Sequence, residues 1–205
     1  MRHKLEFFRD KLKPDSGISW ETPIAHLIPH MPFAMAIGDS SFTRAGGFLT
    51  TLGFWWHITF PDEVIQCTLH FKSNNVDGRL ILINILEFVM VIINYCAALQ
   101  VVRTTAITSN SHPILLNIMD NVSASNWAIH MCKHSKIGCL LARFFSSLLI
   151  NSPLGINSQW ISTKENIIAD DISCIQKESD NNMLPTFDYS TLKQRYPELR
   201  LYSFF

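Results

Sequence analysis

The chain has 205 residues, of which 47% are hydrophobic and 17% charged, which suffices for one domain with a substantial core. Lysine plus arginine and aspartate plus glutamate both number 17, so the formal net charge is zero and a strongly basic nucleic-acid-binding domain is excluded. Any contact with nucleic acid must therefore be local, metal-mediated or supplied by another domain. The five cysteines form no CxxC pair, which is typical of reduced thiols in a cytoplasmic or nuclear protein.

The first 32 residues contain scattered prolines and no sustained periodicity, so they are predicted to be a lead-in segment. From Phe33 the pattern changes. The run FAMAIGDS predicts a buried strand with Asp39 at its end, and a Gly-Gly turn follows. FLTTL and FWWHITF predict two more strands of an antiparallel meander. Residues 61–79 are expected to form an irregular connection.

Residues 80–99, LILINILEFVMVIINYCAAL, are about as long as a membrane span. They carry Asn84, Glu87 and Asn94, and an acid at the middle of a membrane costs about 2.5–3.5 kcal/mol. No cluster of basic residues flanks either end. We therefore expect a buried core helix and no membrane, with a spanning helix as the alternative. Because Glu87 lies three residues after Asn84, a capping-box role is an alternative to a functional one, although it does not exclude metal binding.

The next predicted strand, PILLNIM, is followed by Asp120. This residue either caps a helix that runs through VSASNWAIHM or serves a site at the end of the strand. KIGCLLARFFSSLLI predicts a second amphipathic helix, GINSQWIS a strand, and ENIIADDISCI a last helix that carries Asp170 and Asp171. The domain is predicted to cover residues 33–176, and residues 177–205 to be a truncated linker or tail.

Four acidic residues stand out along this order of elements. Three of them end an apolar run or lie inside one, where an unpaired carboxylate is costly. No matching basic residues stand beside them, so a pair of divalent cations is the predicted partner. If the first and fourth strands are neighbours, two acids emerge at adjacent strand ends, and two helices bring the others in from either side. The four are Asp39, Glu87, Asp120 and Asp170.

The order and context of these acids resemble the ribonuclease H domain of reverse-transcribing elements, most closely the one that follows reverse transcriptase in DIRS-type (tyrosine-recombinase) retrotransposons. The matching stretches are WETPIAHLIPHMP, GDSSFTRAGGF, INILEF, MDNVSASNWA and NIIADDIS. The resemblance extends over residues 20–205, and the tail YPELRLYSFF resembles the start of the next segment of such polyproteins. It implies an α/β, ribonuclease H-like fold, in which a five-stranded mixed sheet (an antiparallel meander, then alternating strands and helices) is flanked by helices.

The resemblance also implies a metal-dependent endoribonuclease that cleaves the RNA strand of RNA·DNA hybrids and derives from a polyprotein with a reverse transcriptase domain. The implied cofactors are two Mg²⁺ ions, with Mn²⁺ as an alternative, which would activate water and relieve charge on the leaving oxygen. The implied catalytic and metal-holding residues are Asp39, Glu87, Asp120 and Asp170, with Asp171 as a less favoured alternative to the last. The predicted substrate contacts, some of them to 2′-hydroxyls, are Ser40, Ser41, Asn84, Asn121 and Ser123.

The chain departs from the family pattern around its last acid. Trp160 and Thr163 stand in the segment where related domains have a histidine and a glycine, and Cys174 stands where an arginine is usual. These changes are expected to weaken substrate handling and to slow product release. The alternative function is therefore a catalytically inactive retrotransposon relic that retains the fold and weak nucleic-acid binding.

Overall fold

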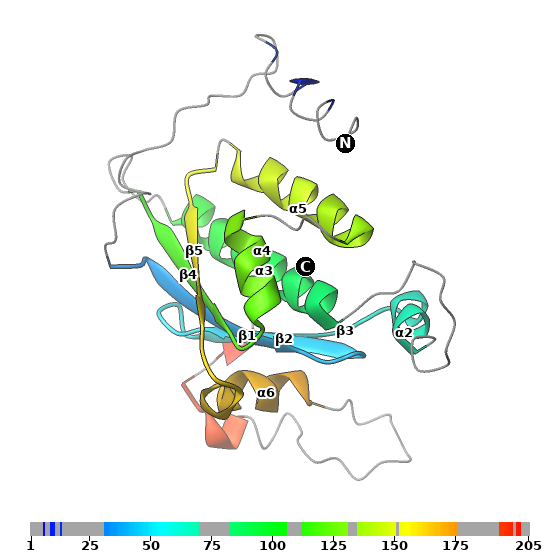
Figure 1. Cartoon of the computed structure of the whole chain (residues 1–205). Helices are drawn as coiled ribbons and strands as arrows, with labels where there is room; N and C mark the ends of the chain where they lie inside the picture. Colours follow the sequence, from blue (N-terminus) through cyan, green and yellow to red (C-terminus); the bar gives the residue numbers. More distant parts are fainter. Residues whose placement is uncertain are drawn as a thin grey trace.

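A mixed sheet forms the centre of the structure, a computed structural model, and helices lie on both faces of the sheet (Figure 1). The described residues are 6, 9–10, 13, 31–69, 83–105, 112–130, 135–150, 152–175, 193–198 and 200–201. Most of the predicted lead-in segment and much of the predicted tail lie outside these residues. The boundaries of the domain therefore stay predictions.

The sheet has the strand order β5-β4-β1-β2-β3-β6. Its first three strands, β1 (Ala34–Ser40), β2 (Arg44–Leu49) and β3 (Phe54–Thr59), form the predicted antiparallel meander. β4 (Ile114–Met119) pairs in parallel with β1, and β5 (Gly155–Trp160) pairs in parallel with β4. This order and these directions over the first five strands form a ribonuclease H-like topology, so the predicted fold class is confirmed.

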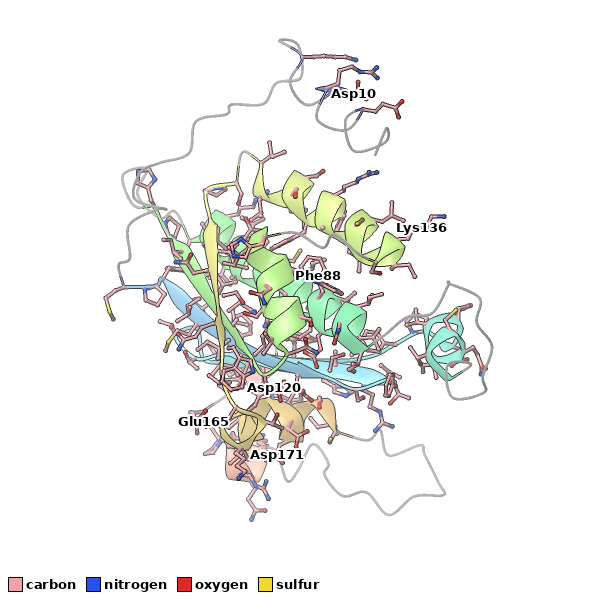
Figure 2. All side chains as sticks on the ribbon, in the orientation of Figure 1. Asp10, Phe88, Asp120, Lys136, Glu165 and Asp171 are labelled. Carbon is pink, nitrogen blue, oxygen red and sulfur yellow. The ribbon has the colours of Figure 1, made fainter. Side chains whose placement is uncertain are left out.

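The helices on one face of the sheet are α3 (Ile83–Thr104), α4 (Val122–His130) and α5 (Lys136–Leu149), and the opposite face carries α6 (Ile167–Ser173) (Figure 1). The main core lies under the first three helices. There the ring of Phe88 on α3, which is labelled in Figure 2, meets the rings of Trp127 and Phe145 edge-on. A smaller second core lies under α6 and contains Phe48, Trp55, Ala169, Ile172 and Ile175.

Two paired glycines let α3 approach the centre of the sheet closely. Gly38 of β1 pairs with Gly47 of β2. A Cβ atom on Gly38 would overlap the side chain of Met90, and one on Gly47 would lie 2.9 Å from the Asn94 amide oxygen. Because these two positions have no side chains on the face that α3 covers, α3 lies closer to the sheet here and comes near the end of β1.

A third glycine serves the opposite face. Gly46 of β2 pairs with Asp39, and a Cβ atom there would lie 2.6 Å from Ile172 Cγ2 and 2.8 Å from Ser173 N. Such distances are below any normal carbon contact. Because Gly46 has no side chain, α6 packs directly on the strand beside Asp39.

Helix α3 is long and apolar enough to cross a membrane, with a mean hydropathy of 2.0 over its most apolar window. However, 72% of that window is buried inside the protein, against the sheet and the neighbouring helices. The burial accounts for the apolar composition, as expected for a core helix.

The prediction of an irregular connection over residues 61–79 is wrong for its first part. Helix α2 (Asp62–Leu69) forms there, with Asp62 and Glu63 in its first turn, where acids favour a helix. Among the described side chains of α2, the hydrophobic ones that pack on the main core are Val64 and Ile65, so the apolar repeat was too short to indicate a helix. Residues 70–79 lie outside the described part.

Part of the predicted tail contributes to the sheet. β6 (Arg200–Leu201) pairs in parallel with β3, beyond the five predicted strands. The backbone N–H of Arg200 donates to the carbonyl of Gly53, which lies in the turn between β2 and β3, at 3.0 Å. Gly53 has a φ of 64°, which a glycine adopts without strain.

We expect Gly46→Ala to destabilise the protein by about 1–3 kcal/mol, because the new methyl group meets the backbone of α6 and forces a shift. Gly38→Ala is the matched comparison. Its methyl group meets Sδ and Cγ of the buried Met90 side chain on the opposite face, so a loss is expected there too. Urea unfolding of both variants measures the losses, and unchanged stability of Gly46→Ala would contradict the close packing of α6.

Candidate metal centre

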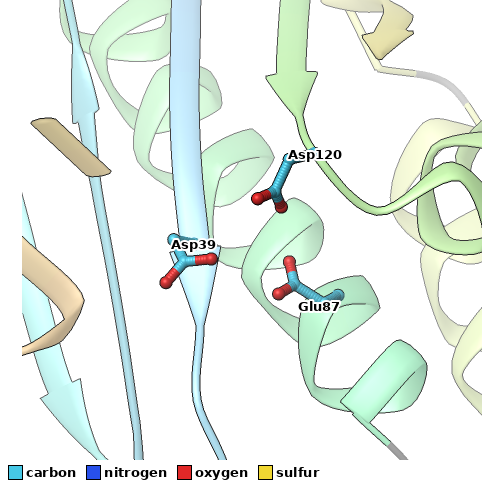
Figure 3. A group of neighbouring side chains, drawn as sticks. All are labelled: Asp39, Glu87 and Asp120. Carbon is cyan, nitrogen blue, oxygen red and sulfur yellow. The ribbon is translucent and has the colours of Figure 1, made fainter. Parts of the chain in front are cut away.

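Three of the four predicted acids meet at one end of the sheet. One carboxylate oxygen from each of Asp39, Glu87 and Asp120 lies within 4.8 Å of the others (Figure 3). Asp39 comes from β1, Glu87 from α3, and Asp120 directly follows β4. The parallel pairing of Ile37 with Ile118 sets this geometry, because each acid lies two residues further along its strand.

Asp39 is held from the α6 side of the sheet. The hydroxyl of Ser173 donates to Asp39 Oδ2 at 2.7 Å, and Ser173 is only 1% exposed. Burial raises the pKa of Asp39, and the nearby charges of Asp120 and Asp170 raise it further, although the Ser173 hydrogen bond opposes the shift.

Glu87 is the most deeply buried of the three acids, at 3% exposed. Its Oε1 atom accepts the backbone N–H of Ser40 at 3.2 Å, whereas its buried Oε2 atom has no hydrogen-bond partner among the described residues. Burial, and then the charges of Asp39 and Asp120, raise its pKa to about 9. Because α3 already includes Ile83, the capping-box alternative for Glu87 is wrong.

Asp120 is free for the site because its neighbour caps the next helix. The side-chain oxygen of Asn121 accepts the backbone N–H of Ala124 at 3.0 Å at the start of α4. The alternative that Asp120 is the cap is therefore wrong. The indole N–H of Trp160, at the end of β5, donates to the Asp120 carbonyl oxygen at 2.9 Å and fixes the backbone there.

The fourth predicted acid, Asp170, lies on α6 and is exposed. It is outside the group of three, but its charge contributes to the raised pKa of Asp39. The alternative, Asp171, has other partners: its Oδ2 atom accepts from Arg195 Nη1 at 2.6 Å and from the Tyr196 hydroxyl at 3.0 Å. These contacts favour Asp170 as the fourth acid of the site.

The five predicted substrate contacts lie close to the acids in sequence, and most already have protein partners. Ser41 Oγ donates to the Arg44 carbonyl at 3.2 Å in the turn after β1. The amide of Asn121 donates to the side-chain oxygen of Asn84 at 2.9 Å, which ties α4 to α3. Ser40 is buried, and Ser123 is half-buried on α4. Their contacts with substrate stay predictions.

A buried network of polar side chains behind the acids was not found from the sequence. The Trp56 indole donates to Asn94 Oδ1 at 2.8 Å, and Asn94 Nδ2 donates to Asn117 Oδ1 at 3.0 Å. The network joins β3, α3 and β4, and thereby fixes the helix of Glu87 against the strand that leads to Asp120. The one available signal was Asn94 itself, a polar residue seven positions after Glu87 in an apolar helix.

The chemistry of the donors suits a hard divalent cation. All three are carboxylates, and no basic side chain in the described part of the chain is among the groups that shift the pKa of Asp39 or Glu87. A cation would compensate the crowded charge and give Glu87 Oε2 a partner. Comparisons with protein-family models, with curated proteins and with solved structures find no match to the chain.

We expect the metal-free protein to lose stability as the pH rises. Glu87 holds its proton more tightly in the folded protein than at its ordinary pKa of 4.5, so folding is favoured at low pH and this advantage is lost progressively up to about pH 9. Each unit of pKa difference corresponds to about 1.4 kcal/mol. Thermal melts in EDTA between pH 5 and 9 should show a falling Tm.

The matched variant is Glu87→Gln, which cannot ionise and should flatten this pH dependence. Mg²⁺ should restore stability at high pH in the wild type only. A wild-type Tm that is constant over the range, or that rises with pH, would contradict the buried position of Glu87.

Proposed function

We propose that this protein is a metal-dependent endoribonuclease that cleaves the RNA strand of RNA·DNA hybrids. One observation carries the proposal: the Oε2 atom of Glu87, buried and without a hydrogen-bond partner in the described part of the chain, lies in a group with Asp39 and Asp120 at the end of a ribonuclease H-like sheet. Nucleases and other phosphoryl-transfer enzymes share this topology, so the topology alone does not define the substrate. The hybrid is supported by the sequence stretches that resemble ribonuclease H domains of retrotransposons.

The residues present fit two Mg²⁺ ions, or Mn²⁺ in their place. Asp39, Glu87 and Asp120 would hold one ion, and Asp170 would join Asp39 at the other. When bound, such ions supply an activated water and stabilise the charge that develops on the phosphate oxygens.

The protein's own contribution is to hold the acids in place before substrate binds. The Ser173 hydroxyl fixes one carboxylate, the Ser40 amide fixes another, and the Trp160 indole fixes the backbone of the third. Groups that are already oriented need no rearrangement during the reaction, and this is a large part of enzymatic rate enhancement. Trp160 is also 50% exposed beside the acids, which makes its fluorescence a probe of binding.

The finer parts of the proposal rest on the family resemblance. Under the proposal, Ser40, Ser41, Asn84, Asn121 and Ser123 contact the hybrid, and 2′-hydroxyl contacts distinguish RNA from DNA. The zero net charge favours an additional domain, a reverse transcriptase in the parent polyprotein, as a source of nucleic-acid affinity. A cytoplasmic or nuclear location follows from the same origin.

We expect the purified protein to cleave the RNA strand of a labelled RNA·DNA hybrid in Mg²⁺, and Asp120→Asn to lower kcat by about 10²–10³-fold, as is typical when one oriented electrostatic group is lost. Asp62→Asn makes the same chemical change in the first turn of α2, at a residue that is outside the group of three acids and is not among the charges that shift the pKa of Asp39 or Glu87, and should retain activity. Gel analysis of the products provides the measurement.

Calorimetric titration with Mn²⁺ separates the alternatives. Ion binding that is lost in Asp120→Asn, with no cleavage by the wild type, would establish the catalytically inactive relic. Absence of ion binding would show that the three acids do not form a metal centre. Equal cleavage by the wild type and Asp120→Asn would show that the activity arises elsewhere.

A further inference from the structure

The C-terminal part of the chain contacts α6 on the side away from the three acids. We call the described residues 193–198 and 200–201 the C-terminal latch. Arg195 and Tyr196 both donate to the same oxygen of Asp171, at 2.6 and 3.0 Å. Figure 2 shows Asp171 at the edge of α6 that faces the latch, while Asp120 lies across the helix.

The latch is fixed at two further points. Tyr196 packs against the second core, which includes Ile172 of α6. Beyond it, β6 forms the edge of the sheet beside β3 and is joined to the Gly53 turn by the Arg200 N–H. Since β3 belongs to the sheet, the latch connects α6 to the edge of the sheet opposite β5.

Helix α6 depends on outside contacts for its orientation. It has 7 residues, too few for a stable isolated helix. Two contacts attach it to β1: Asn166 Nδ2 donates to the Gly38 carbonyl at 3.3 Å, and Ser173 donates to Asp39 at 2.7 Å. Asn166 and Ser173 are seven positions apart and so lie on the same stripe of the helix.

These two contacts, together with the packing of Ala169 and Ile172 in the second core, hold the face of α6 that is turned toward the sheet. At about 100° per residue, Asp171 lies about 140° around the helix from Asn166, far off that stripe. A contact at Asp171 therefore holds α6 from another side. Because Asp170 is the adjacent residue, its direction relative to Asp39 is set at the same time.

We propose that the C-terminal latch, through Asp171, is a positioning element that orients Asp170 toward the metal centre. The proposal rests on the proposed function, in which Asp170 completes the site. Asp171 is thus a positioning residue, and the part of the chain predicted to be a tail is required for full activity.

The position of Asp171 makes it more than an ordinary surface ion pair. Exposed pairs typically contribute about 0–1 kcal/mol to stability. Here the Asp171 side chain is 20% exposed and receives two donors, one from a tyrosine packed on the second core. The expected effect of breaking the pair is therefore local to α6, since the main core lies on the opposite face of the sheet.

The test compares Arg195→Gln, Tyr196→Phe and their combination with Lys193→Gln, in the full-length protein. Lys193→Gln removes the same charge from an exposed residue of the same segment. Hydrogen exchange is measured on α6, residues 167–173, and on β1 and β4, alongside Mn²⁺ titration and hybrid cleavage. The double variant should speed exchange in α6 by about tenfold or more, because it removes two hydrogen bonds to a charged carboxylate, with no change in the strands.

Cleavage and ion binding then distinguish positioning from general stability. The double variant should lower kcat by about tenfold or more, since a small misplacement is costly, while KM and the Mn²⁺ affinity of the Asp39, Glu87 and Asp120 group stay within twofold of wild type. Lys193→Gln should change none of these. A uniform rise in exchange together with weaker ion binding would indicate a merely structural role and overturn the proposal.

The two proposals fail in different ways. If α6 exchange in the double variant equals that of the wild type, the latch is overturned even where cleavage is normal. If the wild type does not cleave hybrids, the proposed function fails, and the exchange data still decide whether the latch holds α6.

Discussion

The burial of Glu87 beside two other acids is the constraint on which the rest of the structure depends. A carboxylate at 3% exposure, with one oxygen unpartnered among the described residues, is costly unless it is protonated or bound to a cation. No basic side chain of the described residues is among the groups that shift the pKa of Glu87, so none of them relieves this cost. Three features keep Glu87 in this buried position: the Ser40 amide, the Asn94 network, and the glycines that let α3 lie close to the sheet. A buried carboxylate that is kept despite this cost is typical of sites that bind ligands or catalyse reactions.

The site is built from both layers of the protein. Glu87 reaches the sheet end from the α3 layer, whereas Asp39 is held by Ser173 from the α6 layer. The two layers have separate cores of very different size. One part of the site is thus fixed by the main core, and the part that carries Asp170 depends on a short helix and its attachments.

The meander and the acids at strand ends could be predicted from the sequence, because apolar runs ended by acids identify strand ends. That the first and fourth strands are neighbours was only a condition of the sequence argument, and the fold class came from the family resemblance. The position of Asp120 relative to Asn121 could not be predicted, since both residue types cap helices equally well. Helix α2 was missed because its apolar repeat is short. The contacts of Asp171 with Arg195 and Tyr196 were missed for another reason. Arg195 and Tyr196 follow Asp171 by 24 and 25 positions in the sequence, and hydrophobic periodicity does not predict contacts over such a separation.

The three glycines at the centre of the β1–β2 hairpin have a consequence for the order in which the protein folds. Glycine has low strand propensity and no side chain to pair across the ladder, so Gly38, Gly46 and Gly47 give this hairpin little stability of its own. The middle of the hairpin is stabilised only when α3 and α6 pack on its two faces. Since α6 ends at Ser173, this end of the sheet is complete only after the chain has been made at least as far as that residue, and translation products that stop before α6 lack the Ser173 contact to Asp39.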